Sequence, residues 1–506
     1  MTAAARGRRH VLGVDVPAAL SLVGSLMKYL SLAALFPAAV AVGYDEPVWP
    51  FLAAGAITAA VGLGLEAVGS GERVGVREGF LVVSATWLFA AGFGALPYLF
   101  SGEDQLSNPV DAYFESMSGF TTTGASVLTD IEGLSRSLAM WRQFTTWLGG
   151  SGFIVLALAV LPRLRVGGRQ MFESEAPGPE VEGLTTTIRD AARRFIGLYI
   201  GVTLLAITTL AVIGWTGLDR RMTFFDAVGH SFSTMATAGF STHGRSFEFF
   251  GVATQWATVF FMVVAGTNFA LMYRAVVGRR PRLFARDEEF RLYVVLLGAG
   301  AALVLVELAT EGIFAGEAVV RHAVFNAVST MTTTGYASAD FNQWTSFTAV
   351  TLVALMFFGA CAGSTTGSVK VVRHLLVAKM LRRELAQTVH PELVSTVRLN
   401  RQLVDERSLR AVIVFVLLYV GIFAVGAFAL VADAARIDLA LRPLDAIAAS
   451  ATTLGNVGPA FGIAGPMGSF AEFSDFSKIV MTGLMYVGRL EVIPVAVLLT
   501  RNYWRV

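Results

Sequence analysis

The chain has 506 residues, of which 55% are hydrophobic and only 15% are charged, with a formal net charge of +2. A soluble chain of this length would carry about 25% charged residues, so the composition excludes an ordinary soluble protein and predicts that much of the surface faces lipid. The single cysteine, Cys361, excludes an internal disulfide framework and a metal site built from several cysteines.

Ten apolar stretches are each long enough to cross the roughly 30 Å of hydrocarbon in a bilayer, for which a helix needs about 20 residues. The first follows a basic segment and continues to Val42 without a clear small-residue cleavage site, so it is interpreted as a retained span rather than a signal peptide. The eighth is too long for one helix and is interrupted by small and polar residues. The predicted spans are 17–43, 48–69, 79–100, 140–161, 195–214, 252–277, 291–310, 344–380, 410–432 and 476–500.

Basic residues cluster in every second loop, whereas the opposite loops contain acidic residues such as Glu103 and Asp104. Random scatter would not give so regular an alternation. By the positive-inside rule, both termini are predicted to be cytoplasmic in a bacterial inner-membrane protein. The clusters comprise Arg6, Arg8, Arg9, Arg73, Arg77, Arg163, Arg165, Arg169, Arg279, Arg280, Arg282, Arg286, Lys379, Arg382, Arg383, Arg501 and Arg505.

The four long loops on the predicted outer side contain related segments that can be aligned on a glycine. They read DAYFESMSGFTTTG (111–124), DAVGHSFSTMATAG (226–239), HAVFNAVSTMTTTG (322–335) and RPLDAIAASATTLG (442–455). One T-x-G carries little information, but four copies in equivalent loops indicate an internal repeat. In this alignment, the threonines two residues before each glycine are Thr122, Thr237, Thr333 and Thr453.

Each repeat is therefore predicted to be a span, a short re-entrant helix, a T-x-G turn and a second span. All four begin and end in the cytoplasm, so they are parallel and predict pseudo-fourfold symmetry about the membrane normal. The fold class is thus an all-α polytopic membrane protein of four span–pore-loop–span repeats plus an N-terminal pair of spans. The predicted units are 17–70 (N-terminal pair), 79–165, 195–285, 291–383 (with a broken second span) and 409–503.

Four such turns at one depth suit a cation path. Non-helical backbone survives within a membrane only inside protein or along a watery cavity. Glycine permits unusual backbone angles, so main-chain carbonyls can replace the hydration shell of an ion. The flanking residues include no carboxylate, which favours a monovalent cation over a divalent one. The alternative, that these small residues only serve helix packing, does not explain four matched segments in loops.

The eighth and tenth predicted spans contain candidate gating residues. Glycines and hydroxyl residues over 359–368 form helices poorly and predict a break near mid-membrane, or else a site of close helix packing. Arg489 has apolar neighbours on both sides, and a charge at the bilayer centre costs about 2.5–3.5 kcal/mol. We expect it to face the path or a polar partner; snorkelling to the interface is the alternative.

Several segments together resemble the TrkH/TrkG branch of the Trk/Ktr/HKT superfamily of potassium transporters. The resemblance covers nearly the whole chain and includes the N-terminal pair of spans. It is carried by FTTTGA (120–125), WLGGSGFIV (147–155), ATAGFST (236–242), TTTGYA (332–337), CAGSTTGSVKVVR (361–373), TTLGNVGPA (452–460) and MYVGRLEVIPV (485–495).

The resemblance implies potassium as the transported substrate and a filter in which carbonyls bind the ion. A glycine in all four copies is the pattern that this superfamily associates with potassium preference. The resemblance also implies an intramembrane gating loop, with Arg489 beneath the filter near that loop. The implied filter residues are Thr122, Thr123, Gly124, Thr237, Ala238, Gly239, Thr333, Thr334, Gly335, Thr453, Leu454 and Gly455, and the implied gate residues are Gly363, Ser364, Thr365, Thr366, Gly367 and Arg489.

Motifs for nucleotide hydrolysis, dinucleotide binding and zinc proteolysis are not found, so we expect no enzymatic activity and no organic cofactor. The basic cytoplasmic segments 163–194 and 381–409 are long enough to dock a partner or are plain solvated loops. The resemblance implies a nucleotide-binding regulatory ring of the TrkA type and a homodimer with two separate pores. A potassium symporter driven by sodium or protons remains an alternative, and a small-solute carrier is a further one, disfavoured because few ionisable groups lie within the spans.

Overall fold

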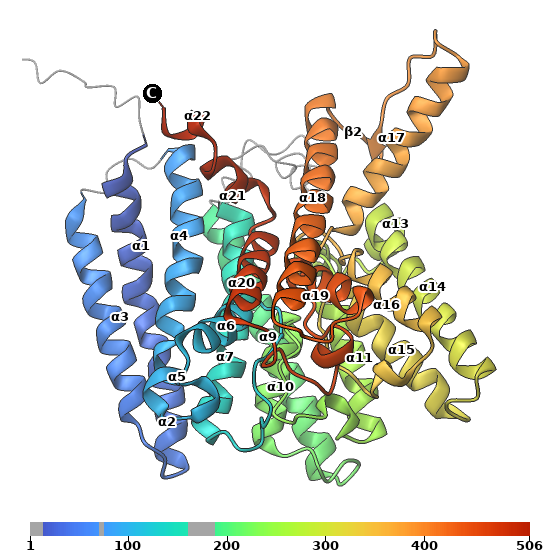
Figure 1. The fold of residues 1–506 in the computed structure, drawn as a ribbon. Coiled ribbons are helices and arrows are strands. Elements are labelled where there is room, and N and C mark those ends of the chain that lie inside the picture. The colour runs from blue at the N-terminus through green and yellow to red at the C-terminus, as the bar shows by residue number, and fades with distance from the viewer. Residues whose placement is uncertain (1–13, 70–74, 160–187, 506) are drawn as a thin grey trace, which may run out of the picture.

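The computed structural model describes residues 14–69, 75–159 and 188–505, and this part of the chain is almost entirely helical (Figure 1). Its only strands form a short antiparallel pair, β1 (Arg398–Leu399) and β2 (Gln402–Leu403). The prediction of an all-helical fold is confirmed. Residues 1–13, 70–74, 160–187 and 506 lie outside the described residues, and they include most of the segment 163–194 and the basic residues Arg6, Arg8, Arg9, Arg73, Arg163, Arg165 and Arg169.

Two antiparallel helices form the N-terminal unit beside the rest of the molecule (Figure 1). The first consists of α1 (Val16–Ser31), η1 (Leu32–Ala34) and α2 (Leu35–Gly43), and the second is α3 (Trp49–Val68). Their backbones cross closely, because a Cβ atom added at Gly24 would lie 2.5 Å from the Gly62 carbonyl oxygen. Small residues allow such close helix packing in membranes.

Four further groups of helices follow in chain order, each with a short helix between longer ones. The first is α4 (Val76–Gly94), α5 (Leu96–Ser101), η2 (Asp104–Leu106), α6 (Pro109–Phe120) and α7 (Arg136–Ala159). The second is α9 (Ile188–Trp215), α10 (Phe224–Ala236), η3 (Ser246–Glu248), α11 (Val252–Ala265), α12 (Phe269–Met272) and η4 (Tyr273–Val277), with α13 (Arg282–Arg286) as connector. The third is α14 (Glu288–Thr310), α15 (Glu317–Met331), η5 (Phe341–Gln343), α16 (Ser346–Met356) and α17 (Val371–Val389). The fourth is α18 (Glu406–Arg436), α19 (Pro443–Gly455), η6 (Gly462–Ala464), α20 (Asp475–Arg489), α21 (Ile493–Leu498) and α22 (Arg501–Trp504).

The short helices α6, α10, α15 and α19 have defined starts and stops. Asn108 caps α6 by accepting from the Val110 N–H at 2.9 Å, and Thr223 with Asp226 forms a capping box on α10. Proline occupies the first position of α6 and of α19, where no helical N–H partner is lost. The last residues of all four helices are buried, so each helix ends inside the protein.

Three of the predicted spans are broken, although the sequence indicated only the eighth. Between α16 and α17 the chain forms an irregular loop, as predicted for residues 359–368. In the sixth span, α11 and the segment α12–η4 meet at 100°. In the tenth, α20 ends at Arg489, and Glu491 and Val492 take positive φ angles of 57° and 61°.

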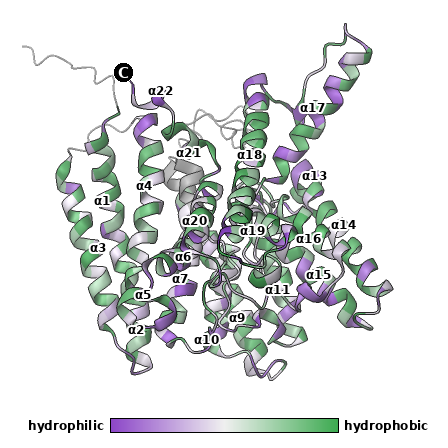
Figure 2. Cartoon of the chain, viewed as in Figure 1, coloured by the Kyte–Doolittle hydropathy of each residue, from purple (hydrophilic) through white to green (hydrophobic). Residues whose placement is uncertain are grey.

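Six helices are long and apolar enough to cross a membrane among the described residues, or seven if the bent pair counts as one span. Figure 2 shows that α1, α3 and α14 are mostly hydrophobic along their lengths. Exposed apolar side chains on these helices include those of Leu52, Val295 and Val306. The C-terminal α22 lies near the start of α4, where the Tyr503 hydroxyl donates to the Arg77 carbonyl at 2.8 Å. The starts of α1 and α4 therefore lie at the same end of the molecule as α22 (Figure 1).

Candidate functional site

The first three predicted turns share one backbone geometry. Threonine takes a left-handed conformation at Thr122, Thr237 and Thr333, with φ of 53°, 53° and 50°. The glycine two residues later is also left-handed, with φ of 82°, 73° and 79° for Gly124, Gly239 and Gly335. The middle residue is tied back to its helix, because the N–H groups of Thr123, Ala238 and Thr334 donate to Ser118, Ser233 and Ser329 at 2.8, 2.9 and 2.8 Å.

The fourth turn lies three residues beyond the predicted one, so the prediction of Thr453, Leu454 and Gly455 is wrong in register. These residues form the last part of helix α19, and the Thr453 hydroxyl donates to the Ala449 carbonyl within that helix at 2.6 Å. The turn is Asn456–Val457–Gly458 instead. Asn456 has φ of 53° and Gly458 has φ of 119°, and the Val457 N–H donates to Thr452 at 2.9 Å, as in the other repeats.

The four turns contact one another in a closed cycle. A Cβ atom added at Gly124 would lie 2.0 Å from the Ala238 carbonyl oxygen, and one added at Gly239 would lie 2.2 Å from that of Thr334. One added at Gly335 would lie 1.9 Å from the Val457 oxygen, and one added at Gly458 would lie 2.9 Å from the Thr123 oxygen. Each glycine therefore faces the next repeat, and the fourth returns to the first. We call this arrangement of Gly124, Gly239, Gly335 and Gly458 the glycine ring.

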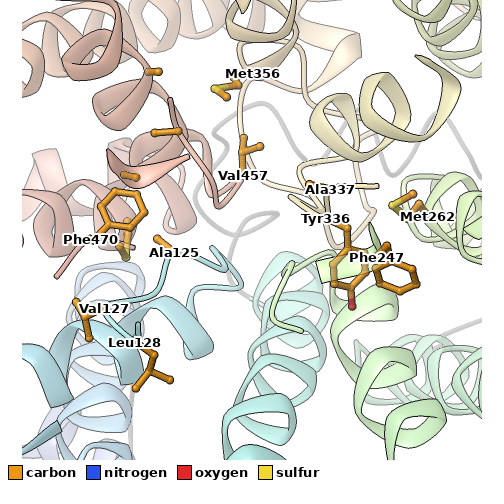
Figure 3. Packing of buried hydrophobic residues seen from close by; sticks show 14 of the residues in the cluster. Ala125, Val127, Leu128, Phe247, Met262, Tyr336, Ala337, Met356, Val457 and Phe470 are labelled. Carbon is orange, nitrogen blue, oxygen red and sulfur yellow. The ribbon is translucent and has the colours of Figure 1, made fainter. Parts of the chain in front are cut away.

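Packing around the glycine ring joins neighbouring repeats. In Figure 3, Ala125, Tyr336 and Val457 lie on segments from three repeats that face one central region. The Tyr336 ring lies 4.4 Å from the Phe247 ring, measured between centroids. The Phe470 N–H of the fourth repeat donates to the Ser126 carbonyl of the first at 2.8 Å. These contacts hold the ring in a packed setting, where side chains move little.

The loop of the broken eighth span lies directly against three of the turns. The Gly367 N–H donates to the Thr333 hydroxyl at 2.8 Å, and the Thr237 and Thr365 hydroxyls are 3.4 Å apart. A Cβ atom added at Gly367 would lie 2.9 Å from the Cβ atom of Asn456, the first residue of the fourth turn. Ser364, Thr365 and Thr366 are at most 1% exposed. The predicted gate residues are thus brought together beneath the ring, on the side of its threonines and Asn456.

Two cations hold this loop. Arg489 is 1% exposed, and its guanidinium donates to the Thr365 carbonyl at 2.7 Å and to that of Gly149 at 3.3 Å. The Lys370 ammonium donates to the Thr366 carbonyl, and to the Thr366 hydroxyl at 2.9 Å. Burial at this level agrees with a polar partner for Arg489 and excludes snorkelling to the interface.

Sequence reasoning missed the fourth turn and the polar residues behind the turns. Aligned on Gly458, the fourth segment reads DAIAASATTLGNVG (445–458), and its first residues match the Asp-Ala that begins the first two segments. This Asp-Ala match was the feature of the sequence that could have identified the correct register of the fourth turn. Glu115 and His230 are not among the predicted site residues, yet both are fully buried and bond to residues just after the turns.

The arrangement offers oxygen atoms rather than acid–base or metal-binding groups. Within the described residues, no cluster of three or more His, Cys, Asp or Glu side chains is placed to hold a metal ion. The ring instead brings together main-chain carbonyls from four repeats and threonine hydroxyls from three of them. Such groups bind a dehydrated monovalent cation.

Comparisons with known proteins agree on one family. The family model described as "TrkH: Cation transport protein" matches residues 50–505. The Trk system potassium uptake protein TrkH of Escherichia coli K12 is 35% identical over 85% of this chain and 86% of that protein. TrkH of Halomonas elongata is 34% identical, covering 96% of this chain and 98% of that protein. The crystal structure of the potassium transporter TrkH from Vibrio parahaemolyticus matches with a TM-score of 0.86 at 31% identity, covering 97% of this chain and all of that one.

Proposed function

This chain belongs to the TrkH family of cation transport proteins, and from that premise we propose that it takes up potassium through the glycine ring. It is an ion transporter and not an enzyme. The observation that carries the proposal is the closed cycle of contacts from Gly124 to Ala238, Gly239 to Thr334, Gly335 to Val457 and Gly458 to Thr123. Its relatives are named potassium uptake proteins, which supports potassium as the cation.

In this proposal, main-chain carbonyls provide most of the coordination of the ion. The residue before each glycine is Thr123, Ala238, Thr334 or Val457, so side-chain hydroxyls cannot form a symmetric ring there. Carbonyl oxygens are present in every repeat and can replace the hydration shell of potassium. The proposed ion-binding residues are Thr122, Thr123, Gly124, Thr237, Ala238, Gly239, Thr333, Thr334, Gly335, Asn456, Val457 and Gly458.

The loop containing Gly363–Gly367 is the proposed gate, and Arg489 is proposed to hold it closed. The loop lies against Thr237 and Thr333, and in this proposal it closes the space beneath the ring. Arg489 holds it through Thr365 and places a positive charge next to the path, which repels a cation. Opening requires the loop to leave these contacts.

The same premise extends to assembly and orientation. We propose a bacterial inner-membrane location with both termini cytoplasmic, a homodimer of two separate pores, and a nucleotide-binding regulatory ring of the TrkA type as partner. The relatives' names place them in a Trk system, which supports further components. The proposed units remain residues 17–70, 79–165, 195–285, 291–383 and 409–503.

Rubidium uptake into liposomes containing the purified chain tests this function. We expect uptake that potassium inhibits strongly and sodium weakly, and that needs no sodium or proton gradient. Uptake that stops when the sodium or proton gradient is removed would support the symporter instead. Equal inhibition by potassium and sodium would contradict the proposed potassium preference.

A further inference from the structure

One position in the short helices is polar in three repeats and apolar in the fourth. It is the fifth residue of each aligned segment, counted from Asp111, Asp226, His322 and Asp445. Its occupants are Glu115, His230, Asn326 and Ala449, each 0% exposed. A buried polar side chain is costly unless it is hydrogen-bonded, so the partners of the first three show what they hold.

In the first two repeats, this side chain bonds to the segment that leaves the ring. Glu115 accepts from the Ser126 hydroxyl and from the Val127 N–H, both at 3.0 Å. His230 Nδ1 lies 2.9 Å from the Asp226 carbonyl, which can only accept, so Nδ1 carries the proton. Nε2 of the neutral ring then accepts from the Ser241 hydroxyl at 3.0 Å. Ser126 and Ser241 each follow the ring glycine by two residues.

The third repeat has the same kind of hydrogen bond, but its serine follows the ring glycine by three residues instead of two. The fourth repeat has no such bond. The Asn326 amide donates to the Ser338 hydroxyl at 3.0 Å, and its carbonyl accepts from the Ser338 N–H at 3.4 Å. In the fourth repeat, the corresponding residues are Ala449 in the helix and Ala460 after the glycine, and neither has a polar side chain. The side-chain partner and its hydroxyl are thus present together or absent together.

Arg142, from α7, connects the first two of these sites. Its Nε forms a buried ion pair with Glu115, and its Nη1 donates to the Ser241 carbonyl at 2.8 Å. Its guanidinium also lies 3.6 Å from the centre of the Phe240 ring, next to Gly239. One buried cation therefore contacts the segment that follows Gly239 directly and reaches the segment that follows Gly124 through Glu115.

We propose that Glu115, His230 and Asn326 are positioning residues that fix the segments leaving the first three turns and so set how sharply the glycine ring distinguishes potassium from sodium. This inference rests on the proposed function. Carbonyls that bind an ion of one size must be held in place by surrounding residues, because an unsupported turn can contract around a smaller ion. The fourth turn lacks this support and is held instead by the Asn456 amide, which donates to the Thr123 hydroxyl and to the Met485 carbonyl.

The competing explanation is that these bonds only satisfy buried polar groups. Ser116 provides a matched control, because its buried hydroxyl lies on the same helix as Glu115 but donates to the Ala91 carbonyl of α4 at 2.7 Å, away from the ring. Ser116→Ala and Ser241→Ala each remove one buried hydroxyl. The Ser116 hydroxyl makes one hydrogen bond, whereas that of Ser241 donates to His230 and also accepts from the His243 N–H at 3.1 Å. A purely structural role predicts the same outcome for both variants.

The experiment measures the potassium-to-sodium permeability ratio of the full chain in liposomes. Ser241→Ala should lower the ratio by about three- to tenfold through loss of its hydrogen bonds to His230 and His243, whereas Ser116→Ala should leave it unchanged. Ser241→Thr, which retains a hydroxyl, should restore most of the ratio. Should Ser241→Ala not yield folded protein, Ser338→Ala replaces it with the same expected loss.

Two results would overturn the proposal. One is an unchanged ratio in Ser241→Ala and Ser338→Ala, and the other is an equal loss in Ser116→Ala. Both leave the proposed function intact, because the unsubstituted chain still prefers potassium in the same assay. An unsubstituted chain that does not prefer potassium would instead overturn the proposed function, and this inference with it.

Discussion

In the first three repeats the turn is Thr-x-Gly, and a buried polar side chain bonds to the segment beyond it. In the fourth, the turn is Asn456–Val457–Gly458, and the two supporting positions are Ala449 and Ala460. The fourth is held elsewhere: the Asn456 amide donates to the Thr123 hydroxyl and to the Met485 carbonyl, both at 2.9 Å. The ring therefore requires a backbone shape and a glycine facing the next repeat, while the side chains that support it can differ.

The largest effect on ion selectivity is expected from changing a ring glycine of the first three repeats. Gly335→Ser places a side chain where a Cβ atom would lie 1.9 Å from the Val457 oxygen, at φ of 79°. The left-handed conformation alone costs about 1–2 kcal/mol for a residue with a Cβ atom. We expect the potassium preference over sodium to fall at least about tenfold, which corresponds to roughly 1.4 kcal/mol. Unchanged ion ratios in a flux assay would contradict the role of Gly335.

The next effect concerns stability. It distinguishes the first repeat, where Glu115 forms a buried ion pair, from the fourth, where Ala449 occupies the same position. Glu115→Gln leaves the Arg142 charge buried without its carboxylate, and breaking a buried pair costs about 3–5 kcal/mol. Thermal unfolding in detergent should show a clear loss, and Glu115→Gln with Arg142→Met should lose less than Glu115→Gln alone. A double variant as unstable as the sum of the two singles would argue against this coupling.

A moderate effect is expected at Arg489, which the fourth repeat contributes to the loop of the third. Arg489→Ala removes the bond to the Thr365 carbonyl and the positive charge beside the path. A charge-assisted hydrogen bond contributes about 1.5–3 kcal/mol, so rubidium flux through the isolated chain should rise at least several-fold. A fall in flux at normal expression and folding would contradict the role of Arg489 in holding the loop closed.

The smallest effect compares the threonines of two repeats. The Thr333 hydroxyl accepts from Gly367 of the loop, whereas the Thr122 hydroxyl has no hydrogen-bond partner among the described residues. Thr333→Val should raise flux by up to about tenfold, the value of one hydrogen bond of roughly 0.5–1.5 kcal/mol. Thr122→Val is the control: it makes the same change in the ring without removing a bond to the loop, so its flux should rise less than that of Thr333→Val. Equal increases in both variants would show that the bond to the loop is not the cause.

Much of the fold was predictable because its signals are repeated and long. The apolar stretches, the break at 359–368 and the turns at Gly124, Gly239 and Gly335 all follow from composition and spacing. The bend in the sixth span was not, because it lies in an apolar run without proline. There, Asn268 starts a new helix by accepting from the Leu271 N–H at 2.9 Å, a contact that depends on the folded chain.

The error in the fourth turn has a local cause. Thr453-Leu454-Gly455 has the letters of a turn, but Thr453 bonds within α19 and the helix continues to Gly455. The true turn begins with asparagine, which tolerates the left-handed conformation as glycine does. A motif defined by threonine therefore could not identify it, whereas alignment from the Asp-Ala at the start of the segment could.

The most direct test of the glycine ring compares Gly458→Ala with Gly455→Ala in liposomes that contain the full chain. The added Cβ atom of Gly458→Ala meets both a positive φ of 119° and the Thr123 oxygen at 2.9 Å, whereas that of Gly455→Ala lies at a helix end, 3.2 Å from its nearest neighbour. We expect Gly458→Ala to lose most of its potassium preference and Gly455→Ala to keep a ratio close to that of the unsubstituted chain. A loss confined to Gly455→Ala, with Gly458→Ala unaffected, would contradict the ring as described.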